Sequence, residues 1–167
     1  MSHQPPDYDC PFCRVAQDRF DESVWTAPDD VVFRASDLCA FVSAGQFSAD
    51  PDYPGHVLVI PVVHHESLYD IPDGALGRVS ALRRRVSLAF KALGAEGTSS
   101  RQHNEPAGNQ DVWHYHEHVL PRFADDGLYV QPRRRVDDVR RAAQAARIRA
   151  ALTGVLAELP LTPPTSS

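Results

Sequence analysis

Three histidines at alternate positions are the feature of this sequence that most directly indicates chemistry. They are His114, His116 and His118, in the run WHYHEHVLPR that ends at Arg122. If this run is a β-strand, side chains two residues apart share one face, so the three imidazoles line one surface. One histidine could then attack an electrophile such as phosphorus, while its neighbours orient it or protonate a leaving group. The alternative is that they form only the polar face of a half-exposed strand.

A pair of cysteines near the N-terminus suggests that one of these histidines binds a metal. Cys10 and Cys13 have C-x-x-C spacing, which is typical of metal or redox sites and not of a secreted disulfide framework. Same-face neighbours on a strand are roughly 6.5 to 7 Å apart, so three histidines on one ion would need splayed side chains. Two thiolates and two imidazoles make a tetrahedral structural zinc site, with His64 or His65 as the remaining donor. The alternative is a redox pair, although a thioredoxin-like motif is expected within a βαβ pattern.

The composition is typical of a single globular domain. The chain has 167 residues, of which 43% are hydrophobic and 23% charged, enough to bury one core. A net charge of -5 gives no overall electrostatic reason to bind extended nucleic acid or an anionic membrane. No apolar run reaches the roughly 20 residues of a membrane span, and residues 1–17 lack a signal-peptide pattern. We therefore expect a cytoplasmic protein with Cys39 as a buried free thiol.

Short runs of β-branched and aromatic residues predict the strands that carry the candidate side chains. Between the second and third of these runs, the segment Ser43–Gly55 has no hydrophobic periodicity and is expected to be an exposed loop. The predicted strands are Val31–Phe33, Leu38–Val42, Val57–Ile60, Thr98–His103 and Asp111–Arg122.

Two helices complete the predicted fold. Apolar residues recur at helical spacing from Asp73 to Leu93, and Gly94 is a stop signal. The arginine cluster at 83–85 lies mostly off this apolar stripe and is interpreted as a solvated helix face. A last helix is expected from about Val136 to Leu159. This order predicts an α+β fold with a mostly antiparallel five-stranded sheet, one long amphipathic helix and a C-terminal helix.

The chain is expected to form one domain between two loose ends. The domain is assigned to residues 9–159. Prolines near the N-terminus predict a flexible tail at 1–8, and Pro, Ser and Thr predict a second flexible tail at 160–167.

The ordered set of motifs resembles the histidine triad (HIT) family of nucleotide hydrolases and transferases. The similarity covers most of the domain and is closest to the bacterial zinc-containing members, which implies a HIT-like fold. It is carried by Cys10-x-x-Cys13, by Pro54–Pro61 with His56 inside it and His64 beyond it, by Asn104, and by Gln110-x-Val112-x-His114-x-His116-x-His118-x-x-Pro121-Arg122.

The resemblance implies a role for each matched residue. His116, the middle histidine, would attack the α-phosphate of a nucleotide and form a nucleotidyl-histidine that water later hydrolyses. His118 and His56 would hydrogen-bond phosphate oxygens and stabilise developing charge. The polar turn around the phosphate would be formed by Asn104, Asn109 and Gln110. A closed structural zinc site would be formed by Cys10, Cys13, His64 and His114.

Three departures from the family's pattern lie around the triad. Glu117 replaces a usual apolar residue on the opposite strand face, where an unpaired buried carboxylate would be costly. Ser43 stands at the strand end near which many members carry an acidic residue that holds the ribose. Asn109 stands where glycine is common in the family, and Asp111 also differs from the residues usual at its position. The resemblance therefore does not fix leaving-group and nucleoside specificity.

Together these features predict a nucleotide phosphohydrolase or nucleotidyl transferase that acts on nucleoside phosphoramidates or dinucleoside polyphosphates. The alternatives are a non-catalytic nucleotide-binding sensor with a degenerate triad, and a nucleotidyltransferase that uses a second phosphorylated acceptor. The expected partner is a small nucleotide substrate, and the resemblance implies a homodimer. Residues after Arg122, including Arg133–Arg135, are expected to reach the active site of the same or the neighbouring subunit.

Overall fold

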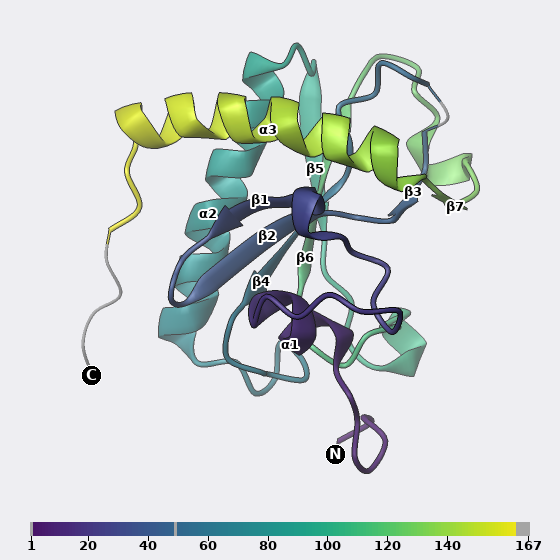
Figure 1. Cartoon of the computed structure of the whole chain (residues 1–167), viewed down its shortest axis with the longest axis vertical. Helices are drawn as coiled ribbons and strands as arrows, with labels where there is room; N and C mark the ends of the chain where they lie inside the picture. The colour runs from purple at the N-terminus through teal and green to yellow at the C-terminus, as the bar shows by residue number, and fades with distance from the viewer. Residues whose placement is uncertain (1, 49, 163–167) are drawn as a thin grey trace.

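An antiparallel five-stranded sheet forms the centre of the structure (Figure 1). This computed structural model describes residues 2–48 and 50–162. The strands β2 and β4 are buried along their whole length, because both lie in the interior of the sheet. The α+β prediction is confirmed. In sheet order, the strands are β1 (Val31–Arg34), β2 (Leu38–Val42), β4 (Val57–Pro61), β6 (Glu117–Arg122) and β5 (Gly97–Arg101).

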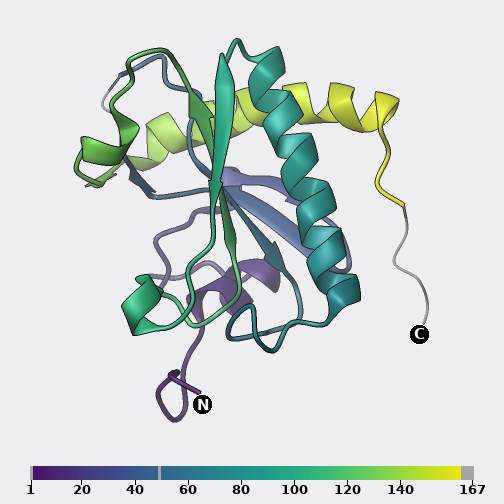
Figure 2. The same cartoon turned by 180° about the vertical axis from the view of Figure 1, so that it is seen from behind.

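Two long helices cover one face of this sheet, and both were predicted. They are α2 (Asp73–Ala92) and α3 (Asp138–Glu158), which cross steeply in Figures 1 and 2. Val79, Leu82 and Val86 of α2 enter the main core together with apolar side chains of α3 and of the sheet. Shortly after α2, Gly94 has a φ of +92°, a left-handed conformation that favours glycine. Within the described residues, no helix is long and apolar enough to cross a membrane.

A short helix on the opposite face was not predicted. This helix, α1 (Pro11–Ala16), begins after Cys10, whose thiol accepts a hydrogen bond from the Cys13 N–H at 3.4 Å. Six residues are too few for a helical period to be visible in the sequence. Its apolar side chains form a second core cluster with Cys39, Phe41, Leu58 and Ile60.

The segment expected to be an exposed loop between β2 and β4 is buried at both ends and exposed at residues 50–52. It contains β3 (Gly45–Gln46), which pairs with β7 (Arg134–Arg135) in a two-stranded sheet. The Gln46 side chain exchanges amide hydrogen bonds with Gln144 of α3, at 2.7 and 3.1 Å. The prediction of exposure is therefore wrong for both ends of the segment, where polar side chains find partners from distant parts of the chain, and right for residues 50–52. Three 3₁₀ helices lie in other connections: η1 (Pro28–Asp30), η2 (Pro106–Gly108) and η3 (Leu128–Val130).

The strand predicted at 111–122 is regular only from Glu117 onward. Before that point the backbone leaves the sheet: the His114 N–H donates to the Val112 carbonyl and the Tyr115 N–H to the His65 carbonyl. His114 and His116 therefore precede β6, and the prediction of three histidines on one strand face is wrong.

The arginines of α2 are more than a solvated surface. Arg84 is exposed, but Arg85 is buried and donates to the carbonyls of Leu159 and Pro160 after α3. Pro160 belongs to the predicted C-terminal tail, of which residues 163–167 lie outside the described residues. In the predicted N-terminal tail, the backbone N–H of His3 donates to the Glu66 carboxylate at 2.5 Å.

Candidate active site and metal cluster

Three histidines meet on the sheet face that carries α1. His118 of β6 pairs in register with Leu58 of β4, and His56 immediately precedes β4. The ring centroids of His116 and His118 are 4.9 Å apart, and those of His56 and His118 are also 4.9 Å apart. The structure thus brings together the three residues that were expected at the phosphate.

Hydrogen bonds determine which nitrogen of each ring carries the proton. His116 Nδ1 donates to the His114 carbonyl at 2.7 Å, because a carbonyl can only accept. His56 Nδ1 likewise donates to the Gly45 carbonyl at 3.2 Å, so its Nε2 accepts from His118 Nδ1 at 2.8 Å. The Nε2 atoms of His116 and His118 therefore keep their lone pairs.

Burial keeps these imidazoles neutral at pH 7. It lowers the pKa of His56 to about 3 and the pKa of His116 to about 4. The pKa of His118 is lowered too, first by burial and then by the neighbouring His56 and His116. A neutral imidazole with a free lone pair is the nucleophilic form.

Two cavities with different linings adjoin His118. The first, of about 280 Å³, is mainly apolar and also contains His116. The second, of about 270 Å³, is lined mostly by polar and charged residues and also contains His56. Both cavities are lined by Asp111, His118 and Arg133. The first cavity is walled by Phe12, Val15, Trp25, Phe41 and Leu58 among others, and the second by Phe47, Arg101, His103 and Asn109 among others.

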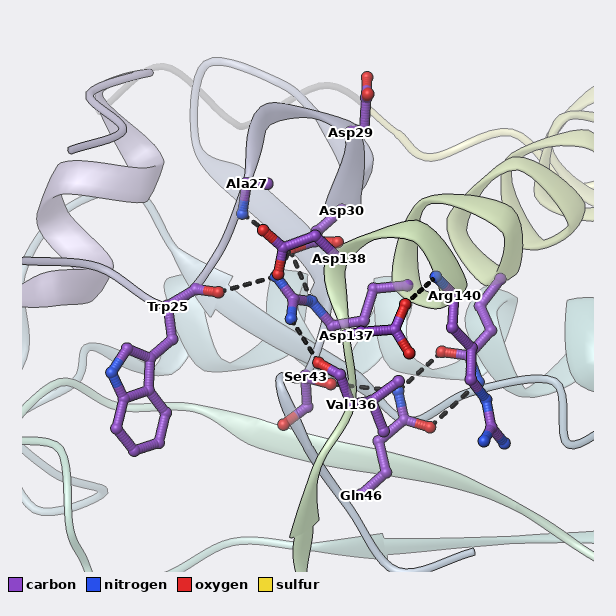
Figure 3. Close-up of polar contacts among 12 residues, drawn as sticks. Trp25, Ala27, Asp29, Asp30, Ser43, Gln46, Val136, Asp137, Asp138 and Arg140 are labelled. Carbon is purple, nitrogen blue, oxygen red and sulfur yellow. Dashed lines mark hydrogen bonds and ion pairs between the residues drawn. The ribbon is translucent and has the colours of Figure 1, made fainter. Parts of the chain in front are cut away.

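A buried arginine holds part of the wall of the first cavity. Arg141 of α3 donates to the carbonyls of Trp25 (2.9 Å) and Val136 (2.7 Å) and to the Asp30 carboxylate (2.9 Å). Figure 3 shows these acceptors converging on one guanidinium group. The Val136 N–H donates in turn to the Ala44 carbonyl at 2.9 Å, beside β3. Arg141 thus links the segment that carries Trp25 to α3 and to the β3 region.

Only one of the three expected polar-turn residues lines a cavity. This residue is Asn109, which has a left-handed backbone with a φ of +65°. Asn104 Oδ1 instead accepts from the Leu68 N–H at 2.9 Å, and Gln110 Nε2 donates to the Glu66 carbonyl at 2.6 Å. The side chains of Asn104 and Gln110 are therefore occupied in holding loops together, and neither lines the two cavities.

Four side chains form a cluster suited to a metal ion. The ligand atoms of Cys10, Cys13, His64 and His114 all lie within 4.8 Å of one another. The sulfur of Cys13 is 3.2 Å from Nδ1 of His64 and 3.4 Å from Nδ1 of His114. Of the two histidines left open by the sequence, the structure therefore places His64 in the cluster.

The far nitrogens of the two clustered histidines have hydrogen-bond partners. His114 Nε2 donates to the Pro61 carbonyl at 3.0 Å, and His64 Nε2 is 3.0 Å from Gln4 Oε1. These bonds leave both Nδ1 lone pairs on the side of the thiols, as in metal-binding histidines. The hydrogen bond from Cys13, together with His114, lowers the pKa of Cys10, which favours a thiolate there. The donors fit a tetrahedral ion such as zinc.

Glu117 is buried on the helix-covered face of β6 and has two partners. Its Oε1 accepts from the Tyr115 hydroxyl at 2.8 Å, and its Oε2 lies 2.8 Å from Nη1 of Arg83. Arg83 belongs to α2 and was interpreted from the sequence as part of a solvated face. That interpretation is wrong for Arg83, because its guanidinium group compensates the buried carboxylate.

Two polar residues of the second cavity were missed in the sequence. Arg101 ends β5 and pairs in register with His118, and His103 follows two residues later, with its ring centroid 5.5 Å from that of His118. The available signal was that side chains alternate between the two faces of the strand ending at Arg101. Assigning one of these faces to the site required knowing that β5 lies beside β6.

Residues 26–125 match the HIT domain family model. The chain belongs to the histidine triad family. A HIT-like protein of Borreliella burgdorferi described as uncharacterized is 32% identical over 72% of this chain and 81% of its own length. The HIT match begins after Cys10 and Cys13, so the cysteines of the metal cluster lie outside the matched residues.

Two HIT relatives have names that state an activity. Adenylylsulfatase HINT3 of Arabidopsis thaliana is 24% identical over 91% of this chain and 72% of its own. Adenosine 5′-monophosphoramidase HNT1 of Saccharomyces cerevisiae is 35% identical over 48% of this chain and 49% of its own. Among solved structures, a zinc-bound histidine triad protein from Mycobacterium smegmatis has a TM-score of 0.74 and 26% identity, covering 90% of this chain and 97% of that one.

Proposed function

We propose that this HIT protein hydrolyses a nucleotide conjugate at its α-phosphorus, with His116 as the nucleophile. The observation that carries the proposal is the free Nε2 of His116 in a cavity that also contains His118. The bond from Nδ1 to the His114 carbonyl fixes the ring and its tautomer, so no reorientation is needed before attack. The names of the two relatives support an adenylyl group as the part transferred.

The reaction would proceed in two displacements at phosphorus. In the first, the Nε2 lone pair of His116 forms an N–P bond while the bond to the leaving group breaks, and the leaving atom keeps the electron pair. In the second, a water oxygen forms a P–O bond while the N–P bond breaks, and that electron pair returns to Nε2. The water proton passes to Nε2 of His118, which is available as a base because Nδ1 donates to His56.

The apolar first cavity would hold the nucleoside. Its aromatic side chains, Phe12, Trp25 and Phe41, offer surfaces on which a base can stack. Ser43 lies in the same cavity, in the region where many family members carry an acidic ribose-binding residue. A hydroxyl can hydrogen-bond the ribose without adding charge.

The metal cluster would hold a structural zinc ion through Cys10, Cys13, His64 and His114. When bound, zinc supplies a four-coordinate cross-link with no position left for substrate. This cross-link would join α1 to the segment before β6 and so support the backbone that carries His116. The homodimer and the cytoplasmic location remain predictions from the family resemblance and the composition.

The activity is tested with three adenylyl conjugates: adenosine 5′-phosphoramidate, adenylylsulfate and diadenosine triphosphate. We expect AMP release by the native chain from at least one, and a rate loss of more than roughly a thousandfold in His116→Ala. His3→Ala removes an exposed histidine outside both cavities and is the matched control. Binding without AMP release would favour the sensor alternative, and AMP transfer to an added sugar phosphate would favour the transferase.

A further inference from the structure

The second cavity brings two arginines next to His118. Arg101 of β5 pairs in register with His118 of β6, and side chains directly opposite on antiparallel strands share a face. Arg133 precedes β7 and lines the same cavity. Among the described charged residues that line it, there are these two guanidinium groups and one carboxylate, that of Asp111. This cavity is therefore locally positive in a chain whose net charge is -5.

Both guanidinium groups are positioned by their surroundings. Arg101 lies over the ring of Phe47, with its guanidinium carbon 5.3 Å from the ring centroid. Arg133 packs against Gly45, where an added Cβ would overlap the Arg133 side chain. Glycine at position 45 thus provides the space for Arg133 to cross β3. Preorganised cations cost less ordering entropy when they bind an anion.

Arg133 is held at the junction of the two cavities by an exchangeable contact. Its Nη1 lies 2.9 Å from Asp111 Oδ2, and both side chains are about half exposed, at 46% and 57%. Exposed ion pairs of this kind contribute little to stability. An anionic group in the cavity could therefore replace Asp111 as the partner of Arg133 at small cost.

The hydrogen bonds of the histidines point to the same kind of ligand. His118 donates its Nδ1 proton to His56, so its Nε2 has no proton to give to a departing atom. An amine needs a proton to leave phosphorus, whereas a phosphate or sulfate oxygen leaves as a stable anion. The resting arrangement is therefore suited to leaving groups that depart without protonation.

We propose that the second cavity is the leaving-group subsite, and that Arg101 and Arg133 select conjugates whose leaving group is an oxyanion, either sulfate or a phosphate chain. This inference rests on the proposed transfer to His116. As the P–O bond breaks, the bridging oxygen keeps the electron pair and the negative charge moves onto the leaving group. The two guanidinium groups stabilise this charge, since planar N–H forks match oxyanions well.

The test compares Arg133→Met and Arg101→Met with the native chain on the same three conjugates. We expect kcat/KM for adenylylsulfate, diadenosine triphosphate or both to fall by roughly 10- to 100-fold, with a change below about threefold for the phosphoramidate. A loss on only one of the two anionic conjugates identifies sulfate or a phosphate chain as the ligand. Arg133→Lys retains the charge and should restore part of the loss. Arg134→Met is the matched control, because Arg134 is exposed and lines neither cavity.

Two results would overturn the inference and can be told apart from failure of the proposed function. AMP release by the native chain, with equal losses on all three conjugates or no loss on any, would leave His116 chemistry intact and remove the leaving-group subsite. No AMP release from any conjugate by the native chain would refute the hydrolysis, and the subsite with it. Thermal unfolding of each variant shows whether an equal loss reflects misfolding.

Discussion

His114, His116 and His118 differ in what their ring nitrogens contact. His114 presents Nδ1 to two thiols, His116 donates Nδ1 to a backbone carbonyl, and His118 donates Nδ1 to His56. These contacts suit the three identical side chains to the different roles proposed for them: metal ligand, nucleophile and proton acceptor. The chemistry of each histidine is therefore determined by its hydrogen-bond partners, which the alternating pattern alone does not reveal.

At the residue scale, His56 should make stability depend on pH. Burial lowers its pKa in the folded chain from 6.5 to about 3. As the pH falls, this imidazole is therefore protonated in the unfolded chain before it is protonated in the folded chain. The free energy of unfolding that is present above pH 6.5 is thus lost progressively as the pH falls toward 3. The loss is about 1.4 kcal/mol per pH unit below 6.5. Between pH 6.5 and 5, urea unfolding should show a loss roughly 1–2 kcal/mol smaller in His56→Asn than in the native chain.

The comparison of these two chains isolates His56. Both contain the same metal cluster and the same buried His114 and His116, so those contributions cancel in the difference, while His118 loses the neighbour that helps to lower its pKa. Identical pH dependence in the two chains would show that His56 is not held neutral by the fold.

Glu117 offers a second test, of a buried carboxylate with two partners. Glu117→Leu frees the partly exposed Arg83 to reach water, but it leaves the Tyr115 hydroxyl without its acceptor. We expect a loss of about 1–3 kcal/mol in the free energy of unfolding, measured with urea. Adding Tyr115→Phe removes the orphaned hydroxyl and should recover much of this loss. If the double variant is less stable than the single variant, the hydroxyl is not the source of the cost.

At the element scale, the metal cluster joins segments that are far apart in the sequence. Cys10 and Cys13 bracket the start of α1, His64 follows β4, and His114 precedes β6. The C-x-x-C spacing predicted a site of two thiolates and two imidazoles, and the family resemblance supplied the choice of His64 and His114. The sequence did not predict α1, which is too short to show a helical period, or the departure of His114 from the strand, which depends on packing between distant segments.

Metal content should follow the cysteines of this cluster. We expect about one zinc per purified chain, lost together with thermal stability in Cys10→Ser. Hydrogen exchange should quicken in α1 and at 111–116, which the cluster connects. Cys39→Ala is the matched control, since Cys39 is buried outside the cluster. Metal-free native protein with the same stability and exchange as the loaded protein would refute the cross-link.

At the scale of the whole molecule, the two faces of the sheet differ. One face packs against α2 and α3 in the main core, and the other carries α1, the histidines and the cavities. Strong local periodicity made the two long helices and most strands predictable. The β3–β7 pair and the position of Arg101 beside His118 were not predictable, since each requires knowing which distant strands are neighbours. Arg133, by contrast, was expected to reach the active site, and it lines both cavities.

The central claim is that His116 forms a covalent nucleotidyl intermediate. Its most direct test is mass spectrometry of the protein quenched at alkaline pH during turnover of an adenylyl conjugate, followed by peptide mapping. We expect one adenylyl group on His116, and neither adduct nor turnover in His116→Ala. An adduct on a different residue, or sustained AMP release by His116→Ala, would contradict the claim.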